Sequence, residues 1–256
     1  MEIRIIVAAH KLYWMPEDPI YLPVQVGAAG KESIGYRRDD EGENISSRNA
    51  NYCELTGLYW AWKHVDADYI GLAHYRRHFA NGKHAGDKKE RVISGAELEE
   101  KLKGTDILLP NPRNYWIETS FSQYAHAHHA ADLATTRKIL SEKYPEYLPM
   151  WDKCMKVTTG HRFNMFVMKK DLFDAYCAWL FDVLFELEKR LDISSYNKND
   201  SRVFGFVSER LLDVWIGTNG YAYKDTPYVF MENQNWIVKG GNFLRRKIRA
   251  GKKDAE

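Results

Sequence analysis

Short apolar runs alternate with longer segments of helical periodicity along this chain. The runs that predict buried strands are residues 3–9, 24–26, 68–73, 106–110, 162–169 and 228–231. The segments that predict helices are residues 55–62, 94–103, 121–143, 171–191 and 200–218. Strands that alternate with helices predict an α/β fold with a helical C-terminal half.

The helix around residues 55–62 has the clearest pattern. Apolar residues recur there at i, i+3, i+4 and i+7 and build one stripe along the helix. Asn51, with Glu54 three residues later, resembles a capping pair for this helix. Ser46 or Ser47 offers an alternative start, so the pattern leaves the first turn open.

Length and composition fit one folded domain. The chain has 256 residues, of which 45% are hydrophobic and 28% charged, so a packed core is expected and disorder is not. We expect a single domain over residues 1–240 and a basic tail over residues 241–256. The 37 basic and 35 acidic residues leave a formal charge of +2, which argues against a dedicated nucleic-acid-binding protein.

Cysteine usage and hydropathy indicate a cytoplasmic protein. Cys53, Cys154 and Cys177 are widely spaced and form no C-x-x-C pair, so neither a zinc knuckle nor a disulfide framework is predicted. We expect no signal peptide before the first strand. No uncharged apolar stretch approaches the roughly 20 residues that a membrane span needs.

Polar and cationic side chains follow three of the predicted strands. Ligands of open α/β sheets bind beyond the carboxyl ends of the strands, so these side chains are candidates for a binding site. They are His10, Lys11, His74, Arg76, Arg77, Asn111 and Arg113. An acidic substrate such as a nucleotide diphosphate suits them, because arginine grips phosphate oxygens with two parallel bonds. The alternative is a solvated strand end whose arginines pair with nearby acids.

Common nucleotide-binding motifs are missing from the chain. It contains neither a P-loop nor a G-x-G-x-x-G sequence, so P-loop enzymes and dinucleotide-dependent enzymes are not predicted.

A histidine cluster at His126, His128 and His129 has two interpretations. His126 and His129 could share one helix face with Asp132 and ligate a metal ion. The chain has no H-E-x-x-H pattern, which argues against that site. Hydrogen bonding at the lining of a pocket is therefore favoured.

Glu209 is the first candidate for a general base. It lies among apolar residues, where partial burial is expected, and a partly buried carboxylate is either ion-paired or functional. Asp200, Glu118 and Glu54 are rivals. Glu54, beside the apolar stripe, fits a cap or a packing hydrogen bond better.

Two sequence blocks carry a family resemblance. They are ELTGLYWAWK at residues 54–63 and HYRR at residues 74–77, with further support at residues 10–11, 164–169 and 204–211. Together they resemble a bacterial family first catalogued as a domain of unknown function. Its members are encoded among capsule, exopolysaccharide and O-antigen genes and are described as glycosyltransferases. The resemblance covers residues 3–236.

The resemblance implies a transferase with a GT-A-like fold, in which a Rossmann-type mixed sheet is flanked by helices. Such an enzyme moves a sugar from a nucleotide-sugar, which we expect to be UDP-linked, to a growing surface polysaccharide. Some members of the family handle galactose or galactofuranose, and that choice is open for this chain. Many GT-A enzymes hold Mn²⁺ or Mg²⁺ with an Asp-x-Asp motif, but residues 73–76 (AHYR) occupy that place here. We therefore expect no metal ligands and no required cofactor, with Mn²⁺ or Mg²⁺ as the alternative.

The resulting hypothesis is inverting transfer by a hexosyltransferase. The residues assigned to the nucleotide and its diphosphate are His10, Lys11, His74, Arg76 and Arg77. The residues assigned to the sugar and the acceptor are Asn111, Arg113, Trp116, His128, His129 and Asn164. Arg76 also stabilises the leaving diphosphate, and Glu209 deprotonates the acceptor hydroxyl from the opposite face.

The expected partners are a nucleotide-sugar and a glycan acceptor, with no nucleic acid. If the acceptor is lipid-linked, the basic tail would contact the inner face of the cell membrane as a peripheral anchor, although a merely solvated tail is the alternative.

The alternative function is a non-catalytic carbohydrate-binding or scaffold module of a polysaccharide assembly complex. The aromatic content of 14% suits it, but neutral glycans need no pair of arginines. A nucleotide hydrolase built on the histidine cluster would need a metal that the spacing does not support.

Overall fold

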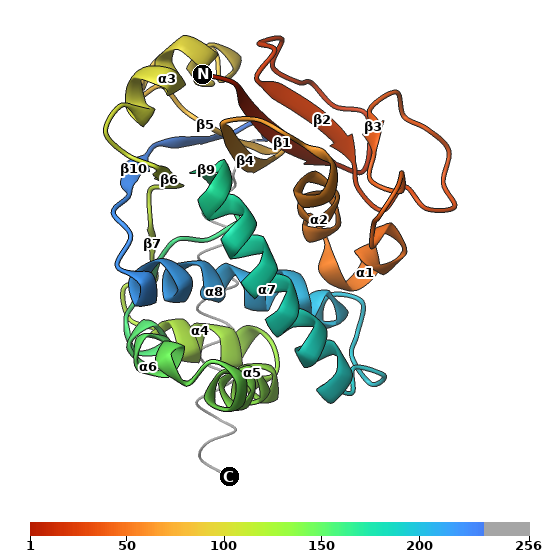
Figure 1. Cartoon of the computed structure of the whole chain (residues 1–256), viewed down its shortest axis with the longest axis vertical. Helices are drawn as coiled ribbons and strands as arrows, with labels where there is room; N and C mark the ends of the chain where they lie inside the picture. The colour runs from red at the N-terminus through yellow and green to blue at the C-terminus, as the bar shows by residue number, and fades with distance from the viewer. Residues whose placement is uncertain (233–256) are drawn as a thin grey trace.

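Residues 1–232 are described by the computed structural model, and the tail expected at residues 241–256 lies outside them. A mixed sheet forms the centre of the described part, and helices cover both of its faces (Figure 1). The expected α/β class, with its helical C-terminal half, is confirmed. None of the helices within residues 1–232 has the length and apolar character that a membrane span requires.

Eleven strands occur in the described residues. They are β1 (Ile3–Ala9), β2 (Tyr21–Gln25), β3 (Arg37–Arg38), β4 (Tyr69–His74), β5 (Arg77–Phe79), β6 (Ile107–Pro110), β7 (Arg113–Asn114), β8 (Thr159–Gly160), β9 (Phe166–Lys169), β10 (Lys224–Thr226) and β11 (Tyr228–Phe230). The central sheet has the order β10-β6-β9-β4-β1-β2-β3, with β5 beside β4 and β11 beside β5. Along this order only β9 runs antiparallel to its neighbours, and β7 and β8 form a separate small sheet.

Eight α-helices accompany these strands in the described residues. They are α1 (Asn49–Tyr52), α2 (Leu55–His64), α3 (Gly95–Leu102), α4 (Ser120–Ala127), α5 (Ala130–Lys143), α6 (Leu148–Lys156), α7 (Lys170–Arg190) and α8 (Val203–Asn219). Short 3-10 helices are η1 (Ser46–Arg48), η2 (Lys89–Arg91), η3 (Pro145–Tyr147) and η4 (Asp200–Arg202).

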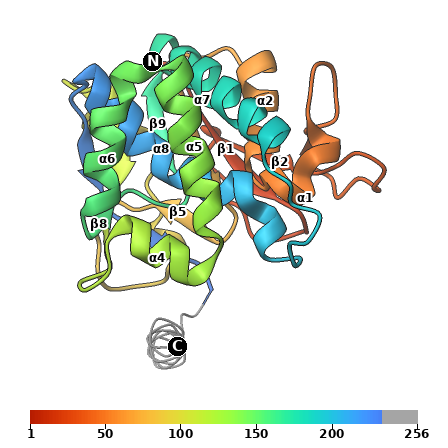
Figure 2. The same cartoon turned by 90° about the horizontal axis from the view of Figure 1, so that it is seen from below.

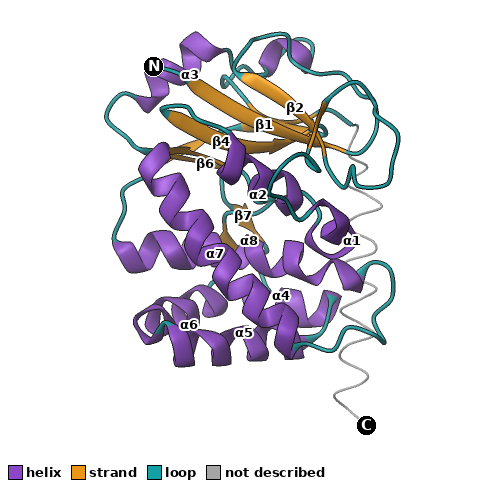
Figure 3. Ribbon diagram, turned by 45° about the vertical axis from the view of Figure 1, so that its right-hand side comes forward, coloured by secondary structure: helices purple, strands orange, loops and turns teal. Residues whose placement is uncertain are grey.

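Alternate side chains of the strands enter two different cores, as the two-residue period of a strand requires. In β1, Ile6 and Ala8 join the larger core with α2, α7 and α8, whereas Ile5 and Val7 join a smaller core with α3. Figure 3 shows the strands as a layer between α3 and the other helices, with α4, α5 and α6 farther from the sheet. Burial on both faces explains why the strands read as near-continuous apolar runs.

Two helix predictions need correction. The helix predicted over residues 121–143 is two helices, α4 and α5, because the extended backbone of His128 interrupts it. A bond to Asp200 and stacking on Phe206 hold His128 in that position. The sequence pattern did not predict α6, a short helix in which only Trp151 and Met155 are buried.

The capping pair expected at Asn51 and Glu54 is wrong. Asn51 Nδ2 donates to the carbonyl oxygen of Ser201, and no side chain caps the first turn of α2. Glu54 instead accepts a hydrogen bond from Asn164 Nδ2 at 2.8 Å. This bond matches the other expectation for Glu54, a packing hydrogen bond.

Strands β1, β4 and β6 point in the same direction, so their carboxyl ends meet at one edge of the sheet. We call this the carboxyl edge. Because β9 runs the other way, the residues just before it, Phe163 and Asn164, reach the same edge. The carboxyl edge therefore gathers segments that are distant in sequence, and it is where an α/β sheet binds ligands.

Candidate active site

A cavity of about 240 Å³ lies at the carboxyl edge. One side of the cavity comes from the junction of α1 and α2 and from the start of α8. The other side comes from the end of β4 and the residues after it, from strand β7, and from Phe163. The lining residues are Cys53, Glu54, His74, Arg76, Arg77, Arg113, Phe163, Arg202, Gly205, Phe206 and Glu209.

Five residues predicted for the site line this cavity together. They are His74, Arg76, Arg77, Arg113 and Glu209. The sequence blocks at residues 54–63, 74–77 and 204–211 therefore meet in one place, although more than a hundred residues separate the second from the third.

Arg77 is a half-buried cation of the cavity. Its guanidinium carbon lies 4.1 Å from the centre of the Phe163 ring, and its Nε has no hydrogen-bond partner among residues 1–232. Burial lowers the pKa of this guanidinium, and the charges of Glu54 and Glu209 oppose that effect. A buried cation with an unpaired donor is unfavourable unless a ligand completes its bonds. Arg77 is therefore suited to receive anionic oxygen atoms.

His74 adds a hydrogen-bond donor without adding charge. Burial, followed by the charges of Arg77 and Arg76, lowers the pKa of His74 to about 2, so its ring is neutral. The His74 Nδ1 accepts the backbone N–H of Arg76 at 3.2 Å. A neutral imidazole has one donor and one acceptor nitrogen, so the proton lies on Nε2.

Three more arginines surround the cavity. The guanidinium of Arg113 lies 5.4 Å from the ring centre of Phe163, and Arg202 Nε donates to Cys53 Sγ at 3.1 Å. Of these three arginines, Arg202 is exposed, and 40% of the Arg76 side chain is accessible. The lining thus holds four arginines and two glutamates, a formal surplus of two positive charges.

Glu54 is open to the cavity on one side and enclosed by protein elsewhere. Its Oε1 accepts the hydrogen bond from Asn164, and burial raises the pKa of the Glu54 carboxyl, with the charge of Glu209 adding to the effect. A carboxylate with a raised pKa is a better proton acceptor near neutral pH. Glu54 is therefore a second carboxylate that can exchange a proton in the cavity.

Glu209 is held at both carboxylate oxygens. Its Oε1 accepts the backbone N–H of Phe163 at 3.2 Å, and its Oε2 lies 3.2 Å from Nη1 of the buried Arg210. Arg210 is fixed in turn by bonds to the carbonyl oxygen of Phe206 and to Gln123. The Glu209 side chain is 20% exposed, so its carboxylate has a defined position while part of the side chain faces the cavity.

Backbone strain is concentrated around the cavity. In the described residues, positive φ angles outside glycine occur at Cys53 (53°), Trp116 (61°), Phe163 (77°) and Asn164 (54°). Such angles are uncommon for these side chains and persist only where surrounding contacts hold them. Cys53 and Phe163 line the cavity, and Asn164 lies directly behind it. No sequence signal marks these positions.

Asn164 supports the cavity from behind its wall. The residue is 4% exposed, and its Nδ2 donates to Glu54 and to the carbonyl oxygen of Gly205 at 3.1 Å. Its Oδ1 accepts from Ser208 Oγ at 2.7 Å. Because these bonds commit its amide to the protein, Asn164 acts on the cavity through Glu54.

His10 and Lys11 lie beside the cavity, next to Tyr75. The ring centres of His10 and Tyr75 are 5.3 Å apart, and Lys11 Nζ is 5.5 Å from the same ring. Burial lowers the pKa of His10, with the charge of Arg76 as the next cause. The sequence-based expectation that His10, His74 and Arg76 gather at one edge is therefore matched by the fold.

Two other predicted residues lie outside the cavity lining. Asn111 is exposed, and its backbone N–H donates to the carbonyl oxygen of Thr226 at 2.9 Å. Trp116 is 81% exposed at a turn after β7. From the loop that includes these two residues, Arg113 reaches the cavity.

The three clustered histidines bond to carboxylates. His126 Nδ1 lies 2.6 Å from Glu118 Oε1, and His128 and His129 share Asp200 at 3.0 and 3.5 Å. The His128 ring also stacks on the ring of Phe206, which lines the cavity, with ring centres 4.2 Å apart. These are the hydrogen-bonding roles that the sequence favoured, although none of the three histidines lines the cavity itself.

The donor set of the cavity does not fit a hard divalent cation. Glu54 is bonded to Asn164, Glu209 is bonded to Arg210, and four arginines surround both carboxylates. Mn²⁺ and Mg²⁺ require several free oxygen ligands. Within residues 1–232, no group of three or more His, Cys, Asp or Glu side chains is arranged to hold a metal ion.

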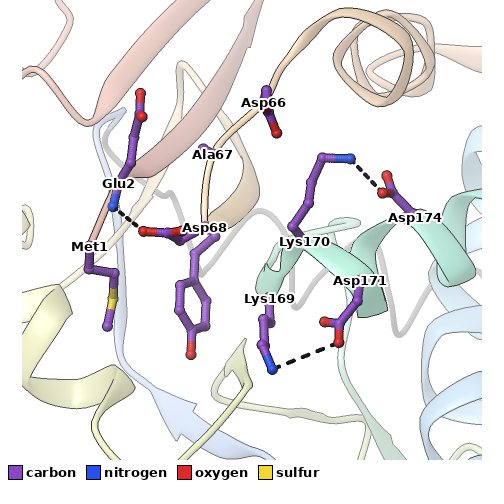
Figure 4. Close-up of a pocket in the computed structure, with 10 residues that line it drawn as sticks. Met1, Glu2, Asp66, Ala67, Asp68, Lys169, Lys170, Asp171 and Asp174 are labelled. Carbon is purple, nitrogen blue, oxygen red and sulfur yellow. Dashed lines mark hydrogen bonds and ion pairs between the residues drawn. The ribbon is translucent and has the colours of Figure 1, made fainter.

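A wider hollow of about 800 Å³ lies at the opposite edge of the sheet, beside the amino ends of β1 and β4 (Figure 4). Four of its charged side chains pair with one another. Lys170 Nζ lies 2.5 Å from Asp174, and Lys169 Nζ lies 3.8 Å from Asp171. This hollow contains none of the predicted site residues, so the carboxyl edge remains the candidate.

Arg202, Phe163 and Cys53 line the cavity without any prediction from the sequence. Cys53 directly precedes one motif block and Arg202 lies two residues before another, so proximity to a block is the only sequence signal they carry. The backbone of Phe163 has a positive φ where it forms part of the cavity wall, and no local sequence pattern predicts that angle.

The fold is similar to that of a known glycosyltransferase. The apo structure of WbbM, a bifunctional glycosyltransferase, matches 91% of this chain with a TM-score of 0.85 and 30% sequence identity. The chain covers 46% of the WbbM chain, so it spans less than half the length of that protein. No curated protein matches the chain.

Residues 4–220 match the protein family described as "Domain of unknown function (DUF4422)". This range holds the two sequence blocks and every residue that lines the cavity. It also agrees with the resemblance to a family first catalogued as a domain of unknown function. The chain therefore belongs to the DUF4422 family.

Proposed function

We propose that this chain is a glycosyltransferase that moves a sugar from a UDP-linked donor to a glycan acceptor. The observation that carries the proposal is the cavity at the carboxyl edge, where four arginines and a neutral histidine donor surround two carboxylates. A pyrophosphate needs such a set of cationic and neutral donors. The similarity to WbbM supports glycosyl transfer as the type of reaction.

In this proposal the donor lies across the carboxyl edge. His10 and Lys11, outside the cavity, contact the nucleotide. Arg76, Arg77 and His74 hold the diphosphate, and fixed positive charge stabilises it as it leaves. The sugar occupies the inner part of the cavity, near the two carboxylates.

Glu209 is the proposed proton acceptor. The acceptor oxygen forms a bond to the anomeric carbon while the bond from that carbon to the diphosphate breaks, and the hydroxyl proton passes to Glu209. Attack from the face opposite the leaving group inverts the anomeric centre. Glu54 is the alternative proton acceptor, because its pKa is raised and it faces the same cavity.

The sugar and the acceptor are proposed from the family resemblance. We propose galactose or galactofuranose as the transferred sugar and a capsule, exopolysaccharide or O-antigen chain as the acceptor. Arg113 contacts the sugar or acceptor from the cavity wall. Asn111, Trp116, His128 and His129 are proposed to contact the acceptor outside the cavity, and Asn164 takes part by positioning Glu54.

Domain extent and location complete the proposal. Residues 1–240 form one catalytic domain, and the basic tail of residues 241–256 contacts the inner face of the cell membrane. The enzyme then works in the cytoplasm on a lipid-linked acceptor.

Nucleotide binding tests this function directly. We expect UDP at about 100 times its dissociation constant to stabilise the protein by about 2.7 kcal/mol. For a chain of this size that corresponds to a rise in Tm of roughly 5–10 °C. The measurement is a thermal-shift series with UDP, GDP and CMP. A non-catalytic carbohydrate-binding module would respond to none of the three nucleotides, and that result would refute the transferase.

Chelation tests the role of the arginines in neutralising the diphosphate. We expect sugar transfer, or slow UDP release from a UDP-sugar, to persist in EDTA, because the leaving charge faces four arginines. The measurement compares UDP release with EDTA and with added Mn²⁺. Complete loss of activity in EDTA that Mn²⁺ restores would contradict the expectation.

A further inference from the structure

An apolar patch is exposed beside the candidate active site. It consists of Trp116 (81% exposed), Ile117 (61%), Phe121 (43%) and Val157 (40%). These are four of the seven large apolar side chains that are exposed among the described residues. Single exposed apolar residues are ordinary, but a contiguous group marks an interaction surface.

Backbone bonds join the two segments that carry the apolar patch. The N–H of Tyr115 donates to the carbonyl oxygen of Thr158 at 2.9 Å. The N–H of Ser120 donates to the carbonyl oxygen of Val157 at 2.8 Å. The turn after β7 and the start of α4 therefore lie against the end of α6. A bond from the Trp116 N–H to Asn114 Oδ1 at 2.7 Å holds the turn that exposes the indole.

Two exposed positive charges lie next to the apolar patch. Lys153 and Lys156 are exposed in the last turn of α6, immediately before Val157. Glu118 lies within the patch segment, but it is 6% exposed and bonded to His126. The patch thus combines exposed aromatic and aliphatic side chains with exposed lysines.

We propose that the apolar patch docks on an anionic membrane surface. Trp116, Ile117 and Phe121 enter the boundary between lipid headgroups and acyl chains, where amphipathic aromatic rings are favoured. Lys153 and Lys156 stay at the level of the lipid phosphates. Lysine is depleted in interfaces between proteins but enriched on membrane-bound faces, so the composition favours lipid over a protein partner.

Docking at this patch would bring the candidate active site close to the bilayer. Arg113 lines the cavity and lies three residues before Trp116. A membrane below the patch would therefore present a lipid-linked acceptor near the cavity, a consequence that rests on the proposed function. The docking itself does not depend on the reaction.

Vesicle binding by the full-length chain tests the proposal. We expect co-sedimentation with vesicles of phosphatidylcholine and phosphatidylglycerol at 0.15 M salt, and weaker binding to phosphatidylcholine alone. The double variant W116S/I117S should bind the anionic vesicles about tenfold or more weakly, because it removes two inserted side chains. The control L12S removes an exposed leucine outside the patch (68% exposed) and should bind as the wild type does.

A second measurement reports insertion itself. Lipids with brominated acyl chains should quench part of the tryptophan fluorescence of the wild type, and the W116F variant should lose that part. Equal vesicle binding by the wild type and W116S/I117S would overturn the proposal, as would no binding by the wild type. Self-association of the wild type that W116S/I117S abolishes, without vesicle binding, would assign the patch to a second copy instead. The UDP thermal shift of each variant is independent of these results and shows separately whether the proposed function holds.

Discussion

Replacing Glu209 by Gln is expected to slow sugar transfer by about 10²- to 10⁴-fold, the usual contribution of a positioned general base. The amide keeps the size of the side chain and can still accept the N–H of Phe163, but it cannot take up a proton. Donor binding should persist, because the arginines of the cavity are untouched. The measurements are kcat from UDP release in the presence of acceptor and the Kd for UDP.

The control for this prediction is Glu99→Gln on α3. This helix lies across the sheet from α8, which carries Glu209 (Figure 3). Its activity should match that of the wild type. If Glu209→Gln turns over normally while Glu54→Gln is inactive, Glu54 is the base and the assignment of Glu209 is wrong. Loss of UDP affinity in Glu209→Gln would instead indicate that the cavity had rearranged.

Replacing Arg77 by Met is expected to weaken UDP binding by about 10- to 100-fold. A hydrogen bond to a charged group contributes about 1.5–3 kcal/mol, and Arg77 is half-buried with a buried, unpaired Nε among the described residues. The free energy of unfolding without nucleotide should change little or rise, because Met removes a half-buried cation and keeps an apolar chain over Phe163. The measurements are titration calorimetry with UDP and urea unfolding.

Two further variants sharpen this prediction. Arg77→Lys keeps the charge but loses the planar fork, so its affinity for UDP should fall between those of the wild type and Arg77→Met. Arg137→Met removes an arginine that pairs with Asp152 on the surface, and it should bind UDP normally. UDP affinity in Arg77→Met equal to that of the wild type would remove Arg77 from the diphosphate site.

The view from below in Figure 2 shows why the site depends on the whole chain. Helices α4, α5 and α6 lie between the viewer and the sheet, and α8 runs behind them. The side chain of Glu209 reaches the cavity from α8, while Arg77 reaches it from the sheet. No single segment of the chain therefore supplies both Glu209 and Arg77 to the cavity.

Several elements were predictable from local pattern alone. The runs at residues 3–9 and 68–73 became β1 and β4 because β-branched and apolar residues fit strands that are buried on both faces. The break between α4 and α5 was not predictable, because its cause is the contact of His128 with Asp200, which is 72 residues away. Helix α6 was missed because its short, charged sequence has only two buried positions.

The sequence by itself determined the alternation of strands and helices and the cations that follow β1, β4 and β6, since both depend on residues that are neighbours in the chain. It also determined that parallel strands bring those cations to one edge. Only the tertiary structure decided that Glu54, Arg202 and Phe163 join them. The place of Phe163 depends on its positive φ, and the places of all three depend on contacts between α2, α8 and the segment before β9. Such long-range packing leaves no periodic trace in the sequence.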